Sequence, residues 1–290
     1  MQLKSVITAI VTPFDLDGKI DYFTFKKIIR EQTEQNVSGV VIFGTTGECC
    51  TLSHDEKISL LKEAVNAAKG EISIIANVGT NSTLESLLLA KEAKELGADY
   101  LLAIVPYYNK PEKEGIIKHF HLLADVGLPM IFYHHPKRTG IELEFETIKA
   151  ISDHPNIFGI KECSSNLELI RRIKKEIPNL KIYSGNDDEL LLQKPCGLDG
   201  VISVVAQLFP DPFLKFFDDD YPLDLQNLIN VIKCVFKEVN PQGIKAAYKI
   251  LGYPNMELRL PLVSVRGETY QAIEQEIKLV LELKSQKSMI

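Results

Sequence analysis

One lysine stands where a buried strand should end. The apolar run at residues 157–161 is long enough for one buried strand, and too short and too rich in β-prone residues for a helix. Partial desolvation at a strand end disfavours the ammonium form of lysine and lowers its pKa. Because a neutral amine attacks carbonyl groups, Lys161 is a candidate Schiff-base nucleophile. The alternative is a strand-end lysine whose charged group lies in water.

Other polar side chains follow the strand-like runs. Residues 44–48 read Gly-Thr-Thr-Gly-Glu, and the hydroxyls of Thr45 and Thr46 suit a small anion such as a carboxylate; a tight turn is the alternative. Tyr133 ends another run, and its phenol can shuttle protons. Arg138 follows and can hold a carboxylate through two parallel hydrogen bonds. Together with the lysine, these groups predict carbonyl chemistry on a small 2-oxo acid.

Two adjacent pairs near these positions have ordinary interpretations. Tyr107 and Tyr108 lie between prolines, and packing or an interface is the default role of such an aromatic pair. His134 and His135 are neighbours at the end of a predicted strand, so they should point to opposite faces, and the sequence offers no third ligand. No metal site is predicted there.

The elements that position these residues alternate in type. Amphipathic stretches of helical period, such as residues 25–35 and 84–96, separate the strand-like runs. Eight such units predict an α/β fold, a (β/α)8 TIM barrel, whose active sites lie at the carboxyl ends of the strands. No Gly-x-Gly-x-x-Gly follows the first run, which disfavours a dinucleotide-binding fold. The predicted strands are residues 6–11, 37–43, 72–78, 99–105, 129–133, 157–161, 180–184 and 200–204.

Three helix starts carry a capping-box pattern, in which a serine precedes a glutamate by three residues. These patterns begin at Ser53, Ser82 and Ser165. Each predicts the first turn of a helix.

The pattern changes after residue 208. Pro210, Pro212 and Pro222 predict a loop-rich passage, and helical stretches follow at residues 223–239, 241–251 and 267–284. We therefore expect a catalytic barrel in residues 1–208. Residues 209–290 are expected to form a helical extension packed on the barrel.

The composition narrows the class of protein. The 290 residues are 45% hydrophobic and 25% charged, with a formal net charge of −6, which is typical of a globular protein. The acidic balance argues against nucleic acid as the main partner, and no apolar run reaches the roughly 20 residues of a transmembrane helix. Residues 1–6 have no signal-peptide layout, so we expect a cytoplasmic protein. The five cysteines show no paired spacing, and the adjacent Cys49 and Cys50 are poorly spaced for zinc.

The chain resembles the dihydrodipicolinate synthase family of pyruvate-dependent class I aldolases, a group that includes N-acetylneuraminate lyase. The resemblance runs from residues 9–14 to residues 258–262. The motifs that carry it are Gly44-Thr45-Thr46-Gly47-Glu48, Pro106-Tyr107-Tyr108-Asn109-Lys110-Pro111, Tyr133, Arg138-Thr139-Gly140, Gly159-Ile160-Lys161-Glu162 and Gly200-Val201-Ile202-Ser203-Val204.

This resemblance implies a reaction and the residues that perform it. Pyruvate would condense with L-aspartate 4-semialdehyde to give 4-hydroxy-tetrahydrodipicolinate, on the lysine and diaminopimelate pathway. Lys161 would form the Schiff base with pyruvate, so no cofactor is implied. Tyr133 and Thr45 would relay protons, and Tyr108 would complete the relay from the neighbouring subunit of a homotetramer, a dimer of dimers.

The resemblance also implies binding residues. Thr46 would hold the pyruvate carboxylate, Arg138 the carboxylate of the semialdehyde, and Gly185 and Ile202 would line the pocket. Several family members bind L-lysine in a cleft at the tight dimer interface. The matching positions here are Cys49, Cys50, His54, Lys57, Asn81, Glu85 and Tyr107.

The sequence departs from the family pattern and leaves rivals open. Residues 133–136 read Tyr-His-His-Pro, where the family usually has Tyr-Asn-x-Pro. Cys49 and Cys50 replace residues that are commonly small, and Asn186 replaces a residue that is usually aspartate. One rival is a lyase for N-acetylneuraminate or another sugar-derived 2-oxo acid, but the sialic acid lyases lack the arginine at Arg138. The other is a non-catalytic binding barrel, which would not need the lysine, the tyrosine and both threonines.

Overall fold

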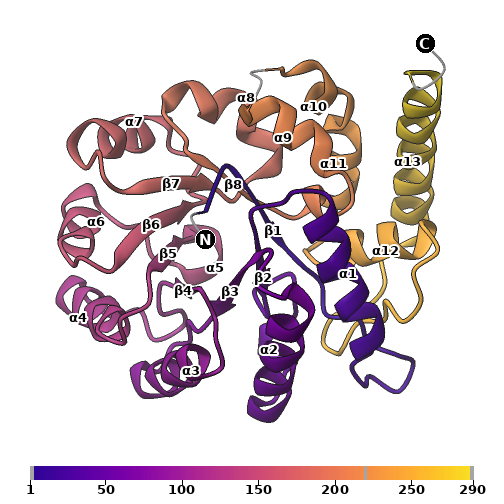
Figure 1. Ribbon diagram of the computed structural model, residues 1–290. Coiled ribbons are helices and arrows are strands. Elements are labelled where there is room, and N and C mark those ends of the chain that lie inside the picture. The colour runs from indigo at the N-terminus through magenta and orange to yellow at the C-terminus, as the bar shows by residue number, and fades with distance from the viewer. Residues whose placement is uncertain (1–2, 219–220, 288–290) are drawn as a thin grey trace.

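The computed structural model describes residues 3–218 and 221–287. Residues 1–2 of the N-terminal stretch, and residues 219–220 and 288–290 of the predicted extension, therefore lie outside it. Eight parallel strands close into a barrel in the order of the sequence (Figure 1). The predicted TIM barrel is confirmed, and every predicted strand is present. The strands are β1 (Val6–Ala9), β2 (Gly39–Ile42), β3 (Ser73–Asn77), β4 (Tyr100–Ile104), β5 (Met130–His134), β6 (Ile157–Glu162), β7 (Lys181–Ser184) and β8 (Gly200–Ser203).

The side chains of the strands alternate between two cores. One set fills the barrel and includes Ile7, Val41, Ile75 and Ile202. The other set packs against the surrounding helices, which form the outer ring in Figure 1. The ring includes α1 (Tyr22–Glu34), α2 (His54–Ala68), α3 (Thr83–Glu95), α4 (Lys113–Ala124), α6 (Phe145–Ser152), α7 (Leu167–Glu176) and α8 (Leu190–Gln193). The short α5 (Pro136–Thr139) lies inside the ring, after β5 (Figure 1).

The predicted helix caps are only partly correct. Ser53 forms the complete box, with its side chain on the N–H of Glu56 and the Glu56 carboxylate on its own N–H. Ser82 caps α3 by accepting from the N–H of Glu85. The third prediction is wrong by one residue, because Ser165 adopts a left-handed backbone (φ 64°) and Asn166 caps α7 instead.

The passage after β8 contains a helix that the sequence did not predict. α9 (Pro210–Asp218) begins with Pro210 and Pro212 in its first turn, where a missing N–H costs no intrahelical bond. The predicted helix at residues 223–239 is two helices, α10 (Leu223–Asn227) and α11 (Ile229–Val235). The two remaining helices, α12 (Gln242–Ile250) and α13 (Gly267–Lys287), match the prediction closely and lie outside the ring beside α11 (Figure 1).

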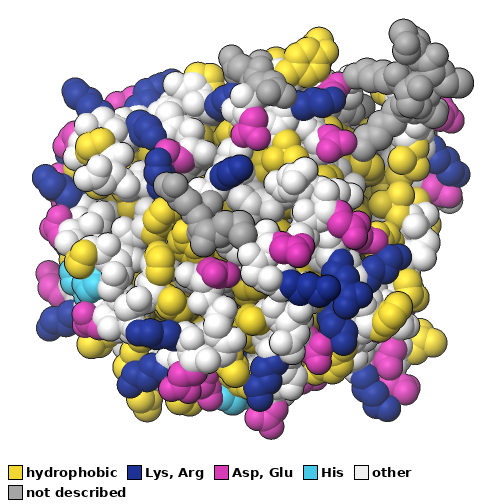
Figure 2. All heavy atoms as spheres, in the orientation of Figure 1, with side chains coloured by type: hydrophobic (Ala, Val, Ile, Leu, Met, Phe, Trp, Pro, Cys, Tyr) yellow, Lys and Arg dark blue, Asp and Glu magenta, His cyan; other side chains and the backbone are white. Residues whose placement is uncertain are grey.

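The surface seen in Figure 2 carries charges of both signs. Over its described residues, Lys and Arg side chains are interspersed with Asp and Glu. In the described ranges 3–218 and 221–287, no helix combines the length and apolar character needed to cross a membrane.

Candidate active site

A cavity of about 650 Å³ lies at the carboxyl ends of the strands. Six of the eight residues predicted for catalysis and substrate binding line it, namely Thr45, Thr46, Tyr133, Arg138, Lys161 and Gly185. One side is closed by the segment after α11, with Phe236 and Asn240, and by the segment after α12, with Leu262. The cavity therefore lies between the barrel and its helical extension, where barrel enzymes carry their chemistry.

Lys161 is buried at the floor of this cavity. Its side chain leaves β6 level with Tyr133 on β5 and Tyr183 on β7. The residue is only 7% exposed, and its Nζ lies 4.4 Å from the centre of the Tyr133 ring. Burial lowers the pKa of the Lys161 amine, although the negative charge of Asp187 acts in the opposite direction. A larger fraction of the Lys161 amine is therefore neutral than in an exposed lysine, as a carbonyl nucleophile requires.

Gly185 makes room for the lysine. A Cβ at this position would lie 2.2 Å from the sulfur of Cys163 and 2.6 Å from Cε of Lys161. Both separations are far shorter than ordinary van der Waals contact. Glycine therefore lets the end of β7 approach the Lys161 side chain.

The phenol of Tyr133 lies beside a thiol that the sequence analysis missed. Tyr133 is buried, which together with the neighbouring Cys163 raises the pKa of its hydroxyl well above 10, so it keeps its proton. It donates a hydrogen bond to Cys163, whose own pKa burial raises to about 12. Cys163 lies two residues after Lys161 and so shares its face of the strand, which is the signal that could have found it.

The threonine turn is held from outside the barrel. Asn240 donates from Nδ2 to Oγ1 of Thr46 across 3.0 Å, while the buried Oδ1 of Asn240 has no hydrogen-bond partner in the described structure. Glu48, in a left-handed backbone (φ 56°), is held by the backbone N–H of Arg259 and by a buried ion pair with Nζ of Lys245 at 2.5 Å. Sequence reasoning missed these contacts.

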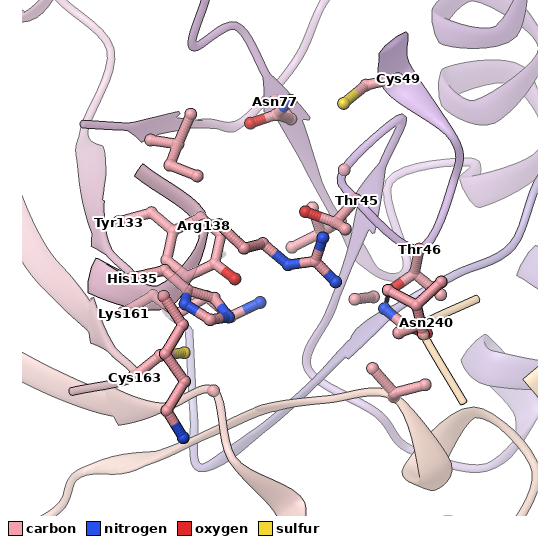
Figure 3. Close-up of a pocket in the computed structure, with 18 of the residues that line it drawn as sticks. Thr45, Thr46, Cys49, Asn77, Tyr133, His135, Arg138, Lys161, Cys163 and Asn240 are labelled. Atoms are coloured by element: carbon pink, nitrogen blue, oxygen red, sulfur yellow. Dashed lines mark hydrogen bonds between the residues drawn. The ribbon is translucent and has the colours of Figure 1, made fainter. Parts of the chain in front are cut away.

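Arg138 reaches across the cavity from α5. In Figure 3 its guanidinium points toward Thr45 and Thr46, opposite Lys161. The ring of His135 lies 5.7 Å from that of Tyr133. Burial, Arg138 and Lys161 lower the pKa of the His135 imidazole to about 4, so it is neutral near pH 7. The cavity thus offers the cations Arg138 and Lys137 for an acid group, beside an uncharged imidazole.

His134 points away from the cavity, as neighbours on a strand should. Its ring is fully buried, and Nδ1 donates to the Glu162 carboxylate across 2.8 Å. Nε2 accepts from the backbone N–H of Leu143 across 2.9 Å. His134 therefore links β5 to β6 through Glu162, the residue that follows Lys161.

Two predicted site residues do not line the cavity. Ile202 is fully buried in the interior of the barrel. Tyr108 is 90% exposed, in a left-handed backbone (φ 74°). Within one chain, its hydroxyl therefore has no place in the site.

The residues predicted for an effector cleft are partly brought together. Burial and the nearby Cys49, Cys50 and Glu85 raise the pKa of Tyr107 to about 12, so these side chains lie near one another. His54 instead bonds through Nε2 to Glu92 across 3.1 Å. Asn81 accepts through its backbone carbonyl from the side chain of Asn109.

A parallel eight-stranded barrel with a desolvated lysine at its carboxyl end is the architecture of the Schiff-base, or class I, aldolases. The model of the dihydrodipicolinate synthetase family matches residues 2–280 of the chain, and the chain belongs to that family.

Individual relatives agree with this assignment. The 4-hydroxy-tetrahydrodipicolinate synthase of Hydrogenobaculum sp. (strain Y04AAS1) is 37% identical, over 95% of this chain and 98% of its own. The pyruvate complex of the chloride-inhibited dihydrodipicolinate synthase from Acinetobacter baumannii is 34% identical, with a TM-score of 0.92 over 96% of this chain and 99% of that one. The lysine-bound enzyme from Cyanidioschyzon merolae is also 34% identical, with a TM-score of 0.91 over 96% and 98%.

Proposed function

We propose that this chain is a 4-hydroxy-tetrahydrodipicolinate synthase, a lyase that condenses pyruvate with L-aspartate 4-semialdehyde. The observation that carries the proposal is the desolvated Lys161 amine beneath the Tyr133 phenol, in a cavity that also holds Arg138 and two threonine hydroxyls. The family and the names of the curated relatives support the choice of substrates. The reaction serves lysine biosynthesis and needs no cofactor beyond the lysine imine.

The first half of the reaction uses the floor of the cavity. The neutral amine of Lys161 attacks C2 of pyruvate, and a proton passed through Tyr133 and Thr45 lets the carbinolamine lose water and become an imine. The hydroxyl of Thr46 donates a hydrogen bond to the pyruvate carboxylate. It is free to do so because Asn240 supplies the hydrogen bond that the same oxygen accepts.

The second half uses Arg138. Loss of a methyl proton turns the imine into an enamine, whose carbon attacks the aldehyde, and the resulting alkoxide takes up a proton. The amino group of the semialdehyde then adds to the imine carbon and displaces Lys161, which closes the ring. Arg138 holds the carboxylate of the semialdehyde during these steps. A sugar-derived acceptor rich in hydroxyl groups would leave this guanidinium without its counter-ion, which disfavours the sialic acid lyase alternative.

We propose a homotetramer built from two tight dimers. The exposure of Tyr108 supports this assembly, because the hydroxyl needs a second subunit's cavity in which to act. A fully active monomer, seen by sedimentation and assay together, would contradict it. The same proposal places the protein in the cytoplasm, in agreement with its five free cysteines.

We also propose that L-lysine binds beside this interface, near Tyr107, Glu85, Asn81 and His54. A relative that is 34% identical was solved with lysine bound. Glu85 can pair with an ammonium group, and Tyr107 and Asn81 can hydrogen-bond the ligand. Partial, saturable inhibition on titration with lysine is expected. Neither inhibition nor calorimetric binding at millimolar lysine would refute the site.

Borohydride trapping tests the central claim. Reduction in the presence of pyruvate should leave a stable adduct on Lys161, identified by peptide mass spectrometry, and Lys161→Ala should show none while remaining folded. A coupled assay should then show turnover with aspartate semialdehyde and little with N-acetylmannosamine. An adduct on a different lysine would overturn the mechanism, whereas preference for the sugar would overturn only the substrate.

A further inference from the structure

Cys49 and Cys50 form a pair of neighbouring thiols at the edge of the active-site cavity. They begin the 3-10 turn Cys49–Thr51, directly after Glu48, and their sulfurs are 3.8 Å apart. Both residues line the cavity, where Figure 3 shows the sulfur of Cys49. Cys50 is exposed and Cys49 is half-buried. In the single chain, a solute entering the cavity can therefore reach the Cys50 sulfur, with Cys49 directly beside it.

The surroundings of the pair give the two thiols different pKa values. A hydrogen bond joins the two sulfurs, and with the cations Lys57 of α2 and Arg138 of α5 it lowers the pKa of Cys50 to about 6 against the effect of burial. The same hydrogen bond and burial raise the pKa of Cys49 well above 9. Tyr107 lies near both thiols, and Glu85 lies near Tyr107. Near pH 7, Cys50 is thus largely a thiolate and Cys49 a thiol.

We propose that Cys49 and Cys50 are a site of reversible oxidation, at which a hydroperoxide converts the two thiols into a vicinal disulfide. An accessible thiolate next to a second thiol is the arrangement of redox-sensing cysteines, in which one sulfur attacks and the other resolves. Neither sulfur is needed for the proposed condensation, so this chemistry is separate from it.

The oxidation takes two steps. The Cys50 thiolate attacks one oxygen of the hydroperoxide, the O–O bond breaks, and the leaving alkoxide or hydroxide takes up a proton, leaving a sulfenic acid on Cys50. Cys49 then attacks that sulfur, the S–O bond breaks, and hydroxide leaves with the Cys49 proton as water. Two thiols are oxidised and one hydroperoxide is reduced to an alcohol, or to water if hydrogen peroxide is used.

The disulfide would alter the neighbouring substrate groups. Its S–S bond of about 2.05 Å is much shorter than the present separation, so the turn that follows Thr45 and Thr46 must shift. Oxidation also removes the thiolate charge near Arg138. Consecutive Cα atoms lie about 3.8 Å apart, closer than in most disulfides, so the bond should be strained and easily reduced. We expect a several-fold lower kcat/KM for the semialdehyde, an effect that rests on the proposed function, whereas the thiol chemistry does not.

Peptide mass spectrometry after treatment with equimolar hydrogen peroxide tests the proposal. The full-length protein should lose two hydrogen atoms from the peptide that contains Cys49 and Cys50, and dithiothreitol should restore them together with any activity lost. In Cys49→Ser, dimedone should trap a sulfenic acid on Cys50. In Cys50→Ser, Cys49 should remain unmodified at the same dose.

Cys234→Ser supplies the matched control, because Cys234 is also half-buried but burial raises its pKa. This variant should form the disulfide as the wild type does. Oxidation of Cys234 before Cys50, or a Cys49–Cys50 peptide that keeps both hydrogens, would overturn the proposal. A protein that forms the disulfide but does not condense pyruvate with the semialdehyde would contradict the proposed function alone.

Discussion

Asn240 donates a hydrogen bond to the hydroxyl of Thr46 across 3.0 Å, although the two residues lie 194 positions apart in the chain. The bond joins the segment between α11 and α12 to the turn that follows β2. It also sets the direction of the Thr46 hydroxyl, because an oxygen that accepts from Asn240 can turn its own proton toward the cavity. The helical extension therefore takes part in the active site as well as in the packing of the barrel.

Asn240→Ala should weaken pyruvate use. One neutral hydrogen bond is worth about 0.5–1.5 kcal/mol, so we expect kcat/KM to fall up to roughly tenfold. Asn240→Asp keeps the shape but can only accept the Thr46 proton, and its charge would repel the pyruvate carboxylate. If the hydrogen bond matters, steady-state kinetics will show the aspartate variant to be worse than the alanine variant. The reverse order would show that Asn240 only fills space.

Gly185→Ala should displace Lys161 without unfolding the protein. The added Cβ meets the ends of the Cys163 and Lys161 side chains at 2.2 and 2.6 Å, and such ends can move more easily than backbone. Borohydride trapping with pyruvate should fall sharply while the melting temperature changes little. Adding Cys163→Ala should restore part of the trapping. Gly267→Ala, where the Cβ has no neighbour within 4 Å, should trap normally.

Arg138→Ala should separate the two substrates. Removal of a charge-assisted pair costs roughly 1.5–3 kcal/mol, which predicts about 10- to 150-fold lower kcat/KM for the semialdehyde. Imine formation with pyruvate should be nearly unchanged in a trapping assay. Arg171→Ala removes the same charge at an exposed position on α7 that does not line the cavity, and it should have a much smaller effect. Equal losses for both substrates would assign Arg138 a structural role.

Asp187 should make stability depend on pH. Burial raises the pKa of its carboxyl to about 6, against hydrogen bonds from the backbone N–H groups of Val204 and Val205. Between about pH 4 and 6, the folded state therefore holds a proton that the unfolded chain, with an ordinary pKa of about 3.9, has already released. This contribution to stability is fully present below about pH 4 and is lost as the pH rises through about 6.

Denaturant titrations between pH 4 and 8 check this dependence. Relative to Asp187→Asn, the wild type should lose up to about 3 kcal/mol of unfolding free energy over that window. Asp188→Asn, at an exposed neighbouring position, should follow the wild type. Parallel curves for wild type and Asp187→Asn would show that the buried carboxyl keeps an ordinary pKa.

The sequence by itself determined the barrel and half of the candidate site. Apolar runs and helical periods are local patterns, so all eight strands could be read from them, although a proline-rich passage concealed α9. Because parallel strands in a barrel direct their carboxyl ends to one rim, the sequence alone predicts that Lys161, Tyr133, Thr45 and Thr46 lie together. The left-handed backbone of Ser165 has no such local signature, so the start of α7 was misplaced by one residue.

Only the tertiary structure decided how these groups are supported. The pairing of Asn240 with Thr46 and of Lys245 with Glu48 joins residues about 200 positions apart, and no periodic pattern encodes such contacts. The burial that lowers the pKa of Lys161 and the close approach that requires Gly185 arise when separate strands meet. The exposure of Tyr108 is likewise a property of the folded surface, because adjacent tyrosines in the sequence do not reveal which of them enters the cavity.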